Sequence, residues 1–194
     1  MNRLFTTAVA ALGLTVASAG TALAACPTPE APAHSKPTKP PLVYIDDTFV
    51  LEAGTACKDK VVFRQRGHVR DPYTVTRHGK EYIIFESGAD LTMRLYNPKT
   101  HKSVTKDISG TFIDRLVKNG RDSKSVGKGA NVFFGKGIKG ILWADGYQKF
   151  YVKNYETEKQ KITIQYTRGK TAELCGKVGS KPVRGKNPPA PPAS

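Results

Sequence analysis

Hydrophobic and polar residues alternate in short runs along the middle of the chain. At 91–96, Leu, Met and Leu alternate with Thr, Arg and Tyr, and at 162–167 Ile, Ile and Tyr alternate with Thr, Gln and Thr. Alternation over about four to eight positions is typical of strands with one buried face. The pattern predicts further strands at 42–51, 60–66, 73–77, 81–86, 102–108, 131–134, 140–144 and 150–153.

Turn residues separate these runs. His78-Gly79 lies between YTVT and KEYIIF, and Asn97-Pro98-Lys99-Thr100 separates two more strands. Asp145-Gly146 lies between ILWA and YQKFYV, and it predicts a hairpin because glycine tolerates a positive φ. Turns at this spacing predict an all-β fold, a single antiparallel β-sandwich or barrel-like domain.

One stretch does not follow the alternation. In TFIDRLVKNG (111–120) the apolar residues recur at helical spacing, so a short helix capped by Thr111 and Gly120 fits as well as an irregular strand. Residues 119–130, NGRDSKSVGKGA, are then predicted to form a long mobile loop. Long loops are often functional or disordered.

The beginning of the chain has the order of a secretory signal peptide. Arg3 is followed by an uncharged apolar run that ends in Ala22-Leu23-Ala24. We therefore assign residues 1–25 to a signal peptide, with a retained membrane anchor as the alternative.

Proline-rich segments flank the expected domain. Residues 26–41 are predicted to form an extended tether, and residues 180–194 a disordered basic tail, because neither has a hydrophobic period. The β-domain is therefore expected at residues 42–179, which is the length of one ordinary domain.

Three cysteines bear on where the protein resides. Leu23-Ala24-Ala25-Cys26 matches a bacterial lipobox, in which cleavage falls before a cysteine that carries diacylglycerol. If Cys26 is lipidated, Cys57 and Cys175 remain to form a disulfide that staples the domain, and export favours disulfides. Ordinary cleavage that leaves Cys26 as a free thiol is the alternative. We expect an extracytoplasmic protein, either anchored in the cell membrane through a lipid on Cys26 and facing outward, or secreted.

The chain is strongly basic, with 31 Lys and Arg residues against 16 Asp and Glu residues. Such a charge indicates anionic partners, which outside a cell are acidic envelope polymers and lipid head groups. An envelope protein is a further candidate partner, and specific nucleic-acid binding is not expected. The basic residues are spread along the sequence, so a generally basic soluble surface is the alternative.

The segment from Gly135 to Gly140 formally matches the dinucleotide motif G-x-G-x-x-G. The motif requires a helix after it, whereas ILWADGYQKFYV predicts strands, so a glycine-rich bend is expected and no cofactor. Backbone amides of this bend, with lysine side chains nearby, are a candidate site for phosphate or another anion. The candidate lysines are Lys124, Lys128, Lys136 and Lys139.

No set of residues has the spacing that catalysis or a metal site requires. The four histidines lack metal-ligand spacing, and no G-x-S-x-G motif is present. Asp46, Asp47 and Asp114 are more readily explained as loop or edge-strand acids than as catalytic carboxylates. We therefore expect a non-catalytic binding protein. The alternatives are a freely secreted enzyme or enzyme inhibitor with a site in the 119–140 region, and a phage-encoded exclusion or immunity lipoprotein.

Three segments carry a resemblance to a family: FVLEAGTAC (49–57), LTMRLYNP (91–98) with the following KSV, and ELCG (173–176). The chain resembles uncharacterised exported β-domain proteins of actinobacteria, over about residues 49–178. The resemblance implies a β fold and a bridge between Cys57 and Cys175, and it implies no activity. The chain departs from the family pattern at His101, where the family tends to have glycine.

Overall fold

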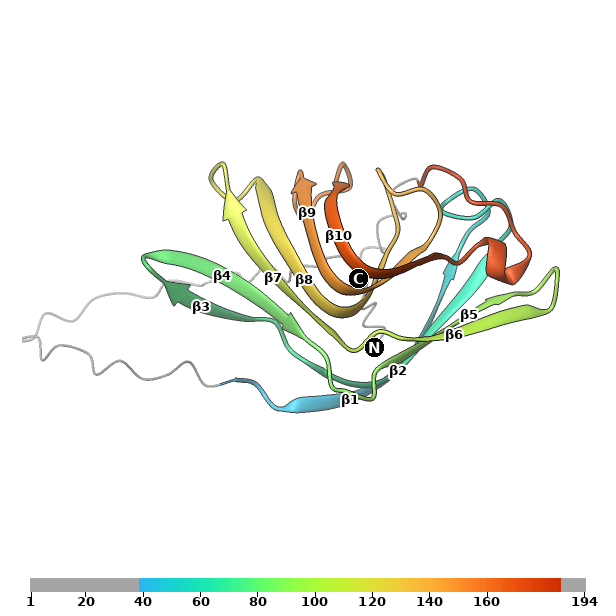
Figure 1. The fold of residues 1–194 in the computed structure, drawn as a ribbon, viewed down its shortest axis with the longest axis horizontal. Helices are drawn as coiled ribbons and strands as arrows, with labels where there is room; N and C mark the ends of the chain where they lie inside the picture. The colour runs from blue at the N-terminus through green and yellow to red at the C-terminus, as the bar shows by residue number, and fades with distance from the viewer. Residues whose placement is uncertain (1–38, 186–194) are drawn as a thin grey trace, which may run out of the picture.

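Two antiparallel sheets contain all ten strands of residues 39–185, the part of the chain that the computed structural model describes (Figure 1). The first sheet has the strand order β1-β2-β5-β6, and the second has the order β10-β9-β8-β7-β4-β3. The predicted all-β antiparallel fold is therefore confirmed. The elements are β1 (Leu42–Leu51), β2 (Val61–Arg70), β3 (Tyr73–Arg77), β4 (Lys80–Glu86), β5 (Thr92–Asn97), β6 (Lys102–Asp107), β7 (Gly110–Val117), β8 (Asp122–Phe133), β9 (Leu142–Lys153), β10 (Lys161–Glu173) and the short 3-10 helix η1 (Gly176–Val178).

The chain alternates between the sheets. The hairpins β1–β2 and β5–β6 form the first sheet, whereas β3–β4 and β7–β10 form the second. Ser87, which follows β4, contacts Gly110, which begins β7, so it links two of the connections between the sheets. Its hydroxyl donates a hydrogen bond to the carbonyl of Gly110 and accepts one from the amide of Gly110, both at 2.8 Å. Because these contacts hold the crossings together, the two sheets form one unit.

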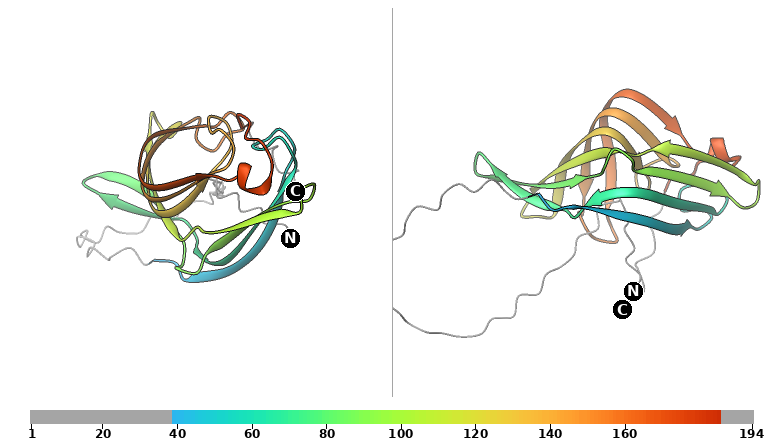
Figure 2. Two further views of the ribbon diagram at one scale, coloured as in Figure 1. Left: turned by 45° about the vertical axis from the view of Figure 1, so that its right-hand side comes forward. Right: turned by 90° about the horizontal axis from the view of Figure 1, so that it is seen from below.

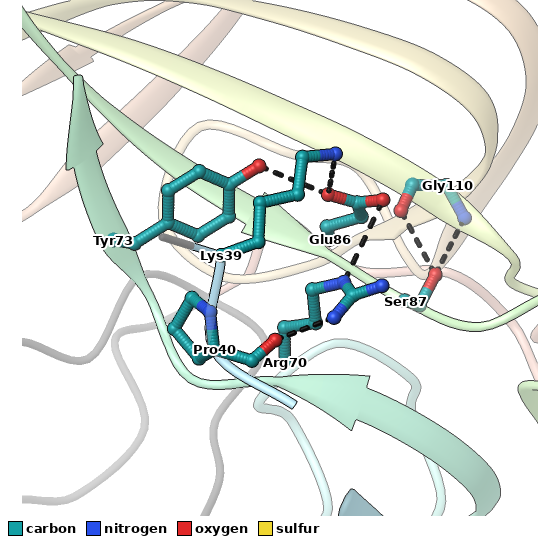
Figure 3. A network of polar contacts seen from close by, with 7 residues as sticks. All are labelled: Lys39, Pro40, Arg70, Tyr73, Glu86, Ser87 and Gly110. Carbon is teal, nitrogen blue, oxygen red and sulfur yellow. Dashed lines mark hydrogen bonds and ion pairs between the residues drawn. The ribbon is translucent and has the colours of Figure 1, made fainter. Parts of the chain in front are cut away.

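A second polar network fixes the first described residues to the base of the β3–β4 hairpin (Figure 3). The carboxylate of Glu86 accepts hydrogen bonds from Lys39 Nζ at 3.1 Å and from the Tyr73 hydroxyl at 3.0 Å. Arg70 forms an ion pair with the same carboxylate and donates a hydrogen bond to the carbonyl of Pro40. Lys39 and Pro40, which the sequence assigned to the tether, are thus held against the domain.

A row of glycines crosses four neighbouring strands of the second sheet. The strand register places Gly110, Gly129, Gly146 and Gly169 side by side on β7, β8, β9 and β10. The last three have φ values of 78°, 128° and 128°, a region that side chains rarely tolerate. A Cβ atom on Gly169 would lie 2.0 Å from the carbonyl oxygen of Asp145. The four strands therefore bend together, and the sheet curls strongly (Figure 2).

The curled sheet is buried on both faces at one end. Phe63 of β2 and Trp143 of β9 belong to a core that joins the two sheets. Phe150 and Ile162 belong to a second core, formed only by the curled sheet and its connecting segments, among them Ile138. Because the second core draws on no residue of the first sheet, it lies inside the curl, and the outer face carries the first core.

One disulfide joins Cys57, which follows β1, to Cys175, which follows β10, with a Cα–Cα distance of 5.5 Å. The predicted pair is confirmed. The bond closes a loop with a sequence separation of 118 residues, for which the chain-entropy model gives about 4–5 kcal/mol of stabilisation. Residues 180–185, which the sequence assigned to the tail, pair with Cys57, Lys136 and Lys139. The predicted signal peptide, Cys26 and the remainder of both proline-rich ends lie outside the described residues.

The loop predicted at 119–130 and the hairpin predicted at Asp145-Gly146 are wrong, and the open choice between helix and strand at 111–120 resolves to a strand. Residues 110–117 form a strand rather than a helix, and most of the predicted loop at 119–130 belongs to β8. Asp145-Gly146 lies within β9 and makes no turn, because Gly146 is one of the glycines at the bend. The turn at His78-Gly79 is confirmed, with φ values of 51° and 67°. His101 has a φ of 56°, so it adopts the left-handed conformation for which glycine is the usual residue.

Candidate functional site

The exposed outer face of the curled sheet carries most of the basic and aromatic side chains of β8, β9 and β10. Cross-strand partners share a face of a sheet, and residues two apart on one strand share it as well. By this register, Lys128 lies beside Tyr147, and Tyr147 lies beside Arg168. We call this surface the Lys–Tyr face. Its members are Lys124, Lys128, Tyr147, Lys149, Tyr151, Tyr166 and Arg168.

The alternation along β8 and β9 explains why these side chains point outward. Lys149 is exposed, whereas its neighbours Gln148 and Phe150 are buried inside the curl. On β8, Lys124 is exposed while the flanking serines are buried. From Tyr147 onward, the interior packing of the even-numbered positions of β9 therefore places the odd-numbered positions on the outer, solvent-facing side.

The positive charge of this face is not neutralised. None of its four basic side chains forms an ion pair with an acidic residue among residues 39–185. Asp122, at the end of the face, accepts a hydrogen bond of 2.5 Å from the Tyr151 hydroxyl and lies 2.9 Å from Lys118 Nζ. The hydrogen bonds from Tyr151 and Lys118 lower the pKa of Asp122. Its charge is thus already matched, and the basic side chains of the Lys–Tyr face stay free to meet an anion from outside.

Two tyrosines give the face an aromatic surface. Tyr147 is 37% exposed and Tyr166 is 51% exposed, and their ring centroids lie 6.2 Å apart. The register places Lys149 directly beside Tyr166. An aromatic ring offers apolar contact area and its hydroxyl offers a hydrogen bond, so the pair can contact the uncharged part of a charged ligand.

The four lysines predicted as an anion site occupy two places. Lys124 and Lys128 lie on the Lys–Tyr face, four positions apart on β8 and so about 13 Å apart. Lys136 and Lys139 lie in the segment between β8 and β9, which packs elsewhere: the carbonyl of Lys136 accepts a hydrogen bond of 2.9 Å from the amide of Ile162. Anion binding by these lysines stays a prediction, and the structure separates them into two pairs.

The glycine-rich bend itself uses its amides within the chain. The amide of Ile138 donates to the carbonyl of Gly135 at 3.1 Å, and the amide of Gly140 donates to the carbonyl of Val183 at 2.8 Å. Gly135, Gly137 and Gly140 all have positive φ values, which agrees with a bend. Two of the amides predicted to bind an anion are thus occupied, so we place the candidate site on the Lys–Tyr face.

Sequence reasoning missed Lys149, Arg168 and the exposed tyrosines. The signal was present, because Tyr147, Lys149 and Tyr151 alternate with the buried residues of β9. The hairpin predicted at Asp145-Gly146 divided β9 into two short strands, so the alternation along the whole strand was not recognised. Arg168 follows the bulge of β10 between Ile164 and Tyr166, where the alternation shifts by one residue.

Inside the curl lies a buried acidic residue. Asp114 of β7 is fully buried and faces Ser125 across the strands, so the prediction of an edge or loop acid is wrong for it. Burial raises its pKa to about 6, although the hydroxyls of Ser125 and Tyr155 favour the charged form. Within residues 39–185 no three His, Cys, Asp or Glu side chains are grouped to hold a metal ion.

Comparisons with protein-family models, with curated proteins and with solved structures find no match. No helix within the described part of the chain is long and apolar enough to cross a membrane.

Proposed function

We propose that the protein is an exported, non-catalytic protein of the cell envelope, held by a lipid on Cys26, that binds an anionic envelope polymer across its Lys–Tyr face. The observation that carries this proposal is the unmatched positive charge of one continuous surface, in which Lys124, Lys128, Lys149 and Arg168 have no acidic partner among residues 39–185. The lipobox at Leu23-Ala24-Ala25-Cys26 and the confirmed disulfide support the location outside the cytoplasm.

The spacing of the charges fits a polymer better than a single small anion. Neighbouring strands lie about 4.8 Å apart, and residues two apart on a strand lie about 7 Å apart, so the basic side chains are spread over a surface rather than gathered at a point. Each exposed charge contributes little by itself, and a chain of negative groups can contact several at once. The tyrosine pair then contacts the sugar or polyol units between the charges.

The alternative of an enzyme or inhibitor site in a long loop loses its premise, because β8 takes up residues 122–133. A cavity of about 750 Å³ does exist elsewhere, at the open side of β3, β4 and β7. Its lining includes Ile83, the cross-strand partner of Asp114, but not the buried Asp114 itself. Binding therefore remains the function that the surface supports best.

The polymer-binding proposal is tested with the mature chain carrying Cys26→Ser and a purified teichoic acid as the probe. Isothermal titration calorimetry should show binding that weakens as salt is raised, because exposed charges are screened. The triple variant Lys124→Glu, Lys128→Glu and Lys149→Glu should lose on the order of a hundredfold in affinity, from about 1 kcal/mol for each charge.

A matched variant controls for net charge. Lys58, Lys102 and Lys177 are exposed and lie outside the Lys–Tyr face, so their replacement by glutamate changes the charge of the chain equally. Equal loss of binding in both triple variants, or binding that is insensitive to salt, contradicts the proposed site. The anchor is tested separately by the intact mass of the protein from its native host, which should show diacylglycerol on Cys26. An unmodified terminus excludes the anchor and leaves polymer binding open to its own test.

A further inference from the structure

The second sheet opens on one side, where β4 and β7 separate. The two strands pair over only four positions, from Ile83 with Asp114 to Glu86 with Thr111. Beyond this point, residues 80–82 of β4 and residues 115–117 of β7 do not pair with each other. Residues 80–82 still pair with β3 on one side, and residues 115–117 still pair with β8. Figure 1 shows the β3–β4 hairpin standing away from β7. Two unpaired strand edges therefore face one another across an opening.

The opening is a cleft of about 750 Å³. Its lining includes Ile83 and Leu116 from the two diverging strands and Thr74 and Thr76 from β3. Leu116 is 39% exposed, one of the few large apolar side chains of the described residues that solvent reaches to this extent. A volume of this size is in the range of ligand sites, and exposed backbone edges are places where another strand can pair.

The register sorts the side chains of the cleft by face. Leu116, Ile83 and Glu81 lie on the face that continues into the interior of the curl, because Asp114 shares that face through its pairing with Ile83. Lys80 and Arg115 lie on the outer face, where Arg115 stands beside Lys124. One face at the cleft therefore offers the apolar pair Ile83 and Leu116 beside polar side chains, and the other is basic.

We propose that this cleft binds an extended segment of a partner protein, which inserts as a strand between β4 and β7. The backbone of the segment hydrogen-bonds to the free edges of both strands, which is the mode of strand addition to a sheet. Its side chains alternate: apolar residues contact Ile83 and Leu116, and acidic residues face Lys80 and Arg115. The cleft adjoins the Lys–Tyr face where Arg115 lies beside Lys124, but its partner is a protein strand rather than a polymer.

The proposal is tested with a capped synthetic peptide of about seven residues that alternates valine and glutamate. The protein is the mature chain with Cys26→Ser, labelled for NMR. We expect amide shifts at residues 80–82 and 115–117, together with slower hydrogen exchange of these amides when the peptide is bound. A peptide of the same composition with its valines and glutamates in two blocks should bind at least tenfold more weakly, because it cannot place apolar and acidic groups on opposite faces.

Two variants identify the groups that hold the peptide. Leu116→Ser should weaken binding roughly tenfold by removing an exposed apolar contact, and Arg115→Glu should weaken it by a similar factor. Lys102→Glu, on the distant β6, should leave it unchanged. Leu116→Ser, on the inner face, should leave teichoic acid binding unchanged, so failure here and failure of the polymer proposal are distinguishable.

Three results overturn the inserted strand. The first is the absence of shifts at millimolar peptide, and the second is equal binding of the block peptide. The third is strong exchange protection of both edges without peptide, which would show that β4 and β7 pair with each other in solution. Shifts confined to β10 would move the peptide to that edge and contradict the cleft.

Discussion

Replacing Asp114 by asparagine tests the energetics of the curled sheet. Asp114 is fully buried, and the hydroxyls of Ser125 and Tyr155 are the polar groups that interact with its carboxylate. Burial raises its pKa from an ordinary 3.8 to about 6. The folded protein therefore holds a proton on Asp114 more tightly than the unfolded chain does.

The sign and size of the effect follow from this difference. Below about pH 3.8 the group is protonated in both states and costs nothing, and between pH 3.8 and about 6 the unfolded chain ionises while the folded protein does not. The free energy of unfolding then falls with rising pH and levels off above the folded pKa. At about 1.36 kcal/mol per unit, the shift amounts to about 3 kcal/mol near neutral pH. Asp114→Asn removes the charge with little change in shape and should recover up to that amount.

Urea unfolding at about pH 4 and about pH 7.5 measures the effect. The variant should gain stability at the higher pH and little at the lower pH. Asp71→Asn is the matched control, because Asp71 is exposed and its replacement removes the same charge far from the buried carboxylate. If Asp114→Asn keeps the pH dependence of the parent chain, or destabilises equally at both pH values, the buried carboxylate does not carry the cost assigned to it.

Three further predictions concern the fold. Gly169→Ala should destabilise by at least about 3 kcal/mol in urea unfolding, because its Cβ atom would lie 2.0 Å from the carbonyl oxygen of Asp145; a change below 1 kcal/mol would show that the bend does not need glycine. Cys57→Ser with Cys175→Ser should cost about 4 kcal/mol, seen as a lower Tm, and reduction of the parent chain should reproduce it. Asp122→Asn should lower stability at neutral pH, and the loss should shrink as the pH falls below 3.8 toward the lowered pKa of the folded carboxyl, because the charge stabilises only where the folded protein is ionised; a loss that does not change with pH would exclude a charge effect.

Strands with one apolar face were predictable from the sequence, and strands that lack such a face were not. In β5, Met93 and Leu95 are buried between exposed neighbours, so the alternation is plain. In β8 the buried positions include Ser123, Ser125 and Gly127, which carry no hydrophobic signal. The inner side of the curl is polar at this point, so β8 resembles a loop in the sequence.

The bend and the site depend on pairing between distant strands, which no local pattern contains. Gly146 carries the usual signal of a hairpin, and its role as part of a bend follows only from its place beside Gly129 and Gly169. The Lys–Tyr face has the same origin, because residues of β8, β9 and β10 become neighbours only through the register. The net positive charge was predictable from the sequence, whereas its concentration on β8, β9 and β10 depends on the strand topology.

The position of the disulfide also determines how the protein responds to mechanical load. If the chain is pulled between residue 39 and residue 185, tension passes from Cys57 through the S–S bond to Cys175. Residues 58–174 form a covalent loop outside this load path, and β2 to β10, with the Lys–Tyr face, lie within that loop. Only β1 and the segment after Cys175 can be peeled away. The described chain can thus be stretched from both ends while the Lys–Tyr face stays folded.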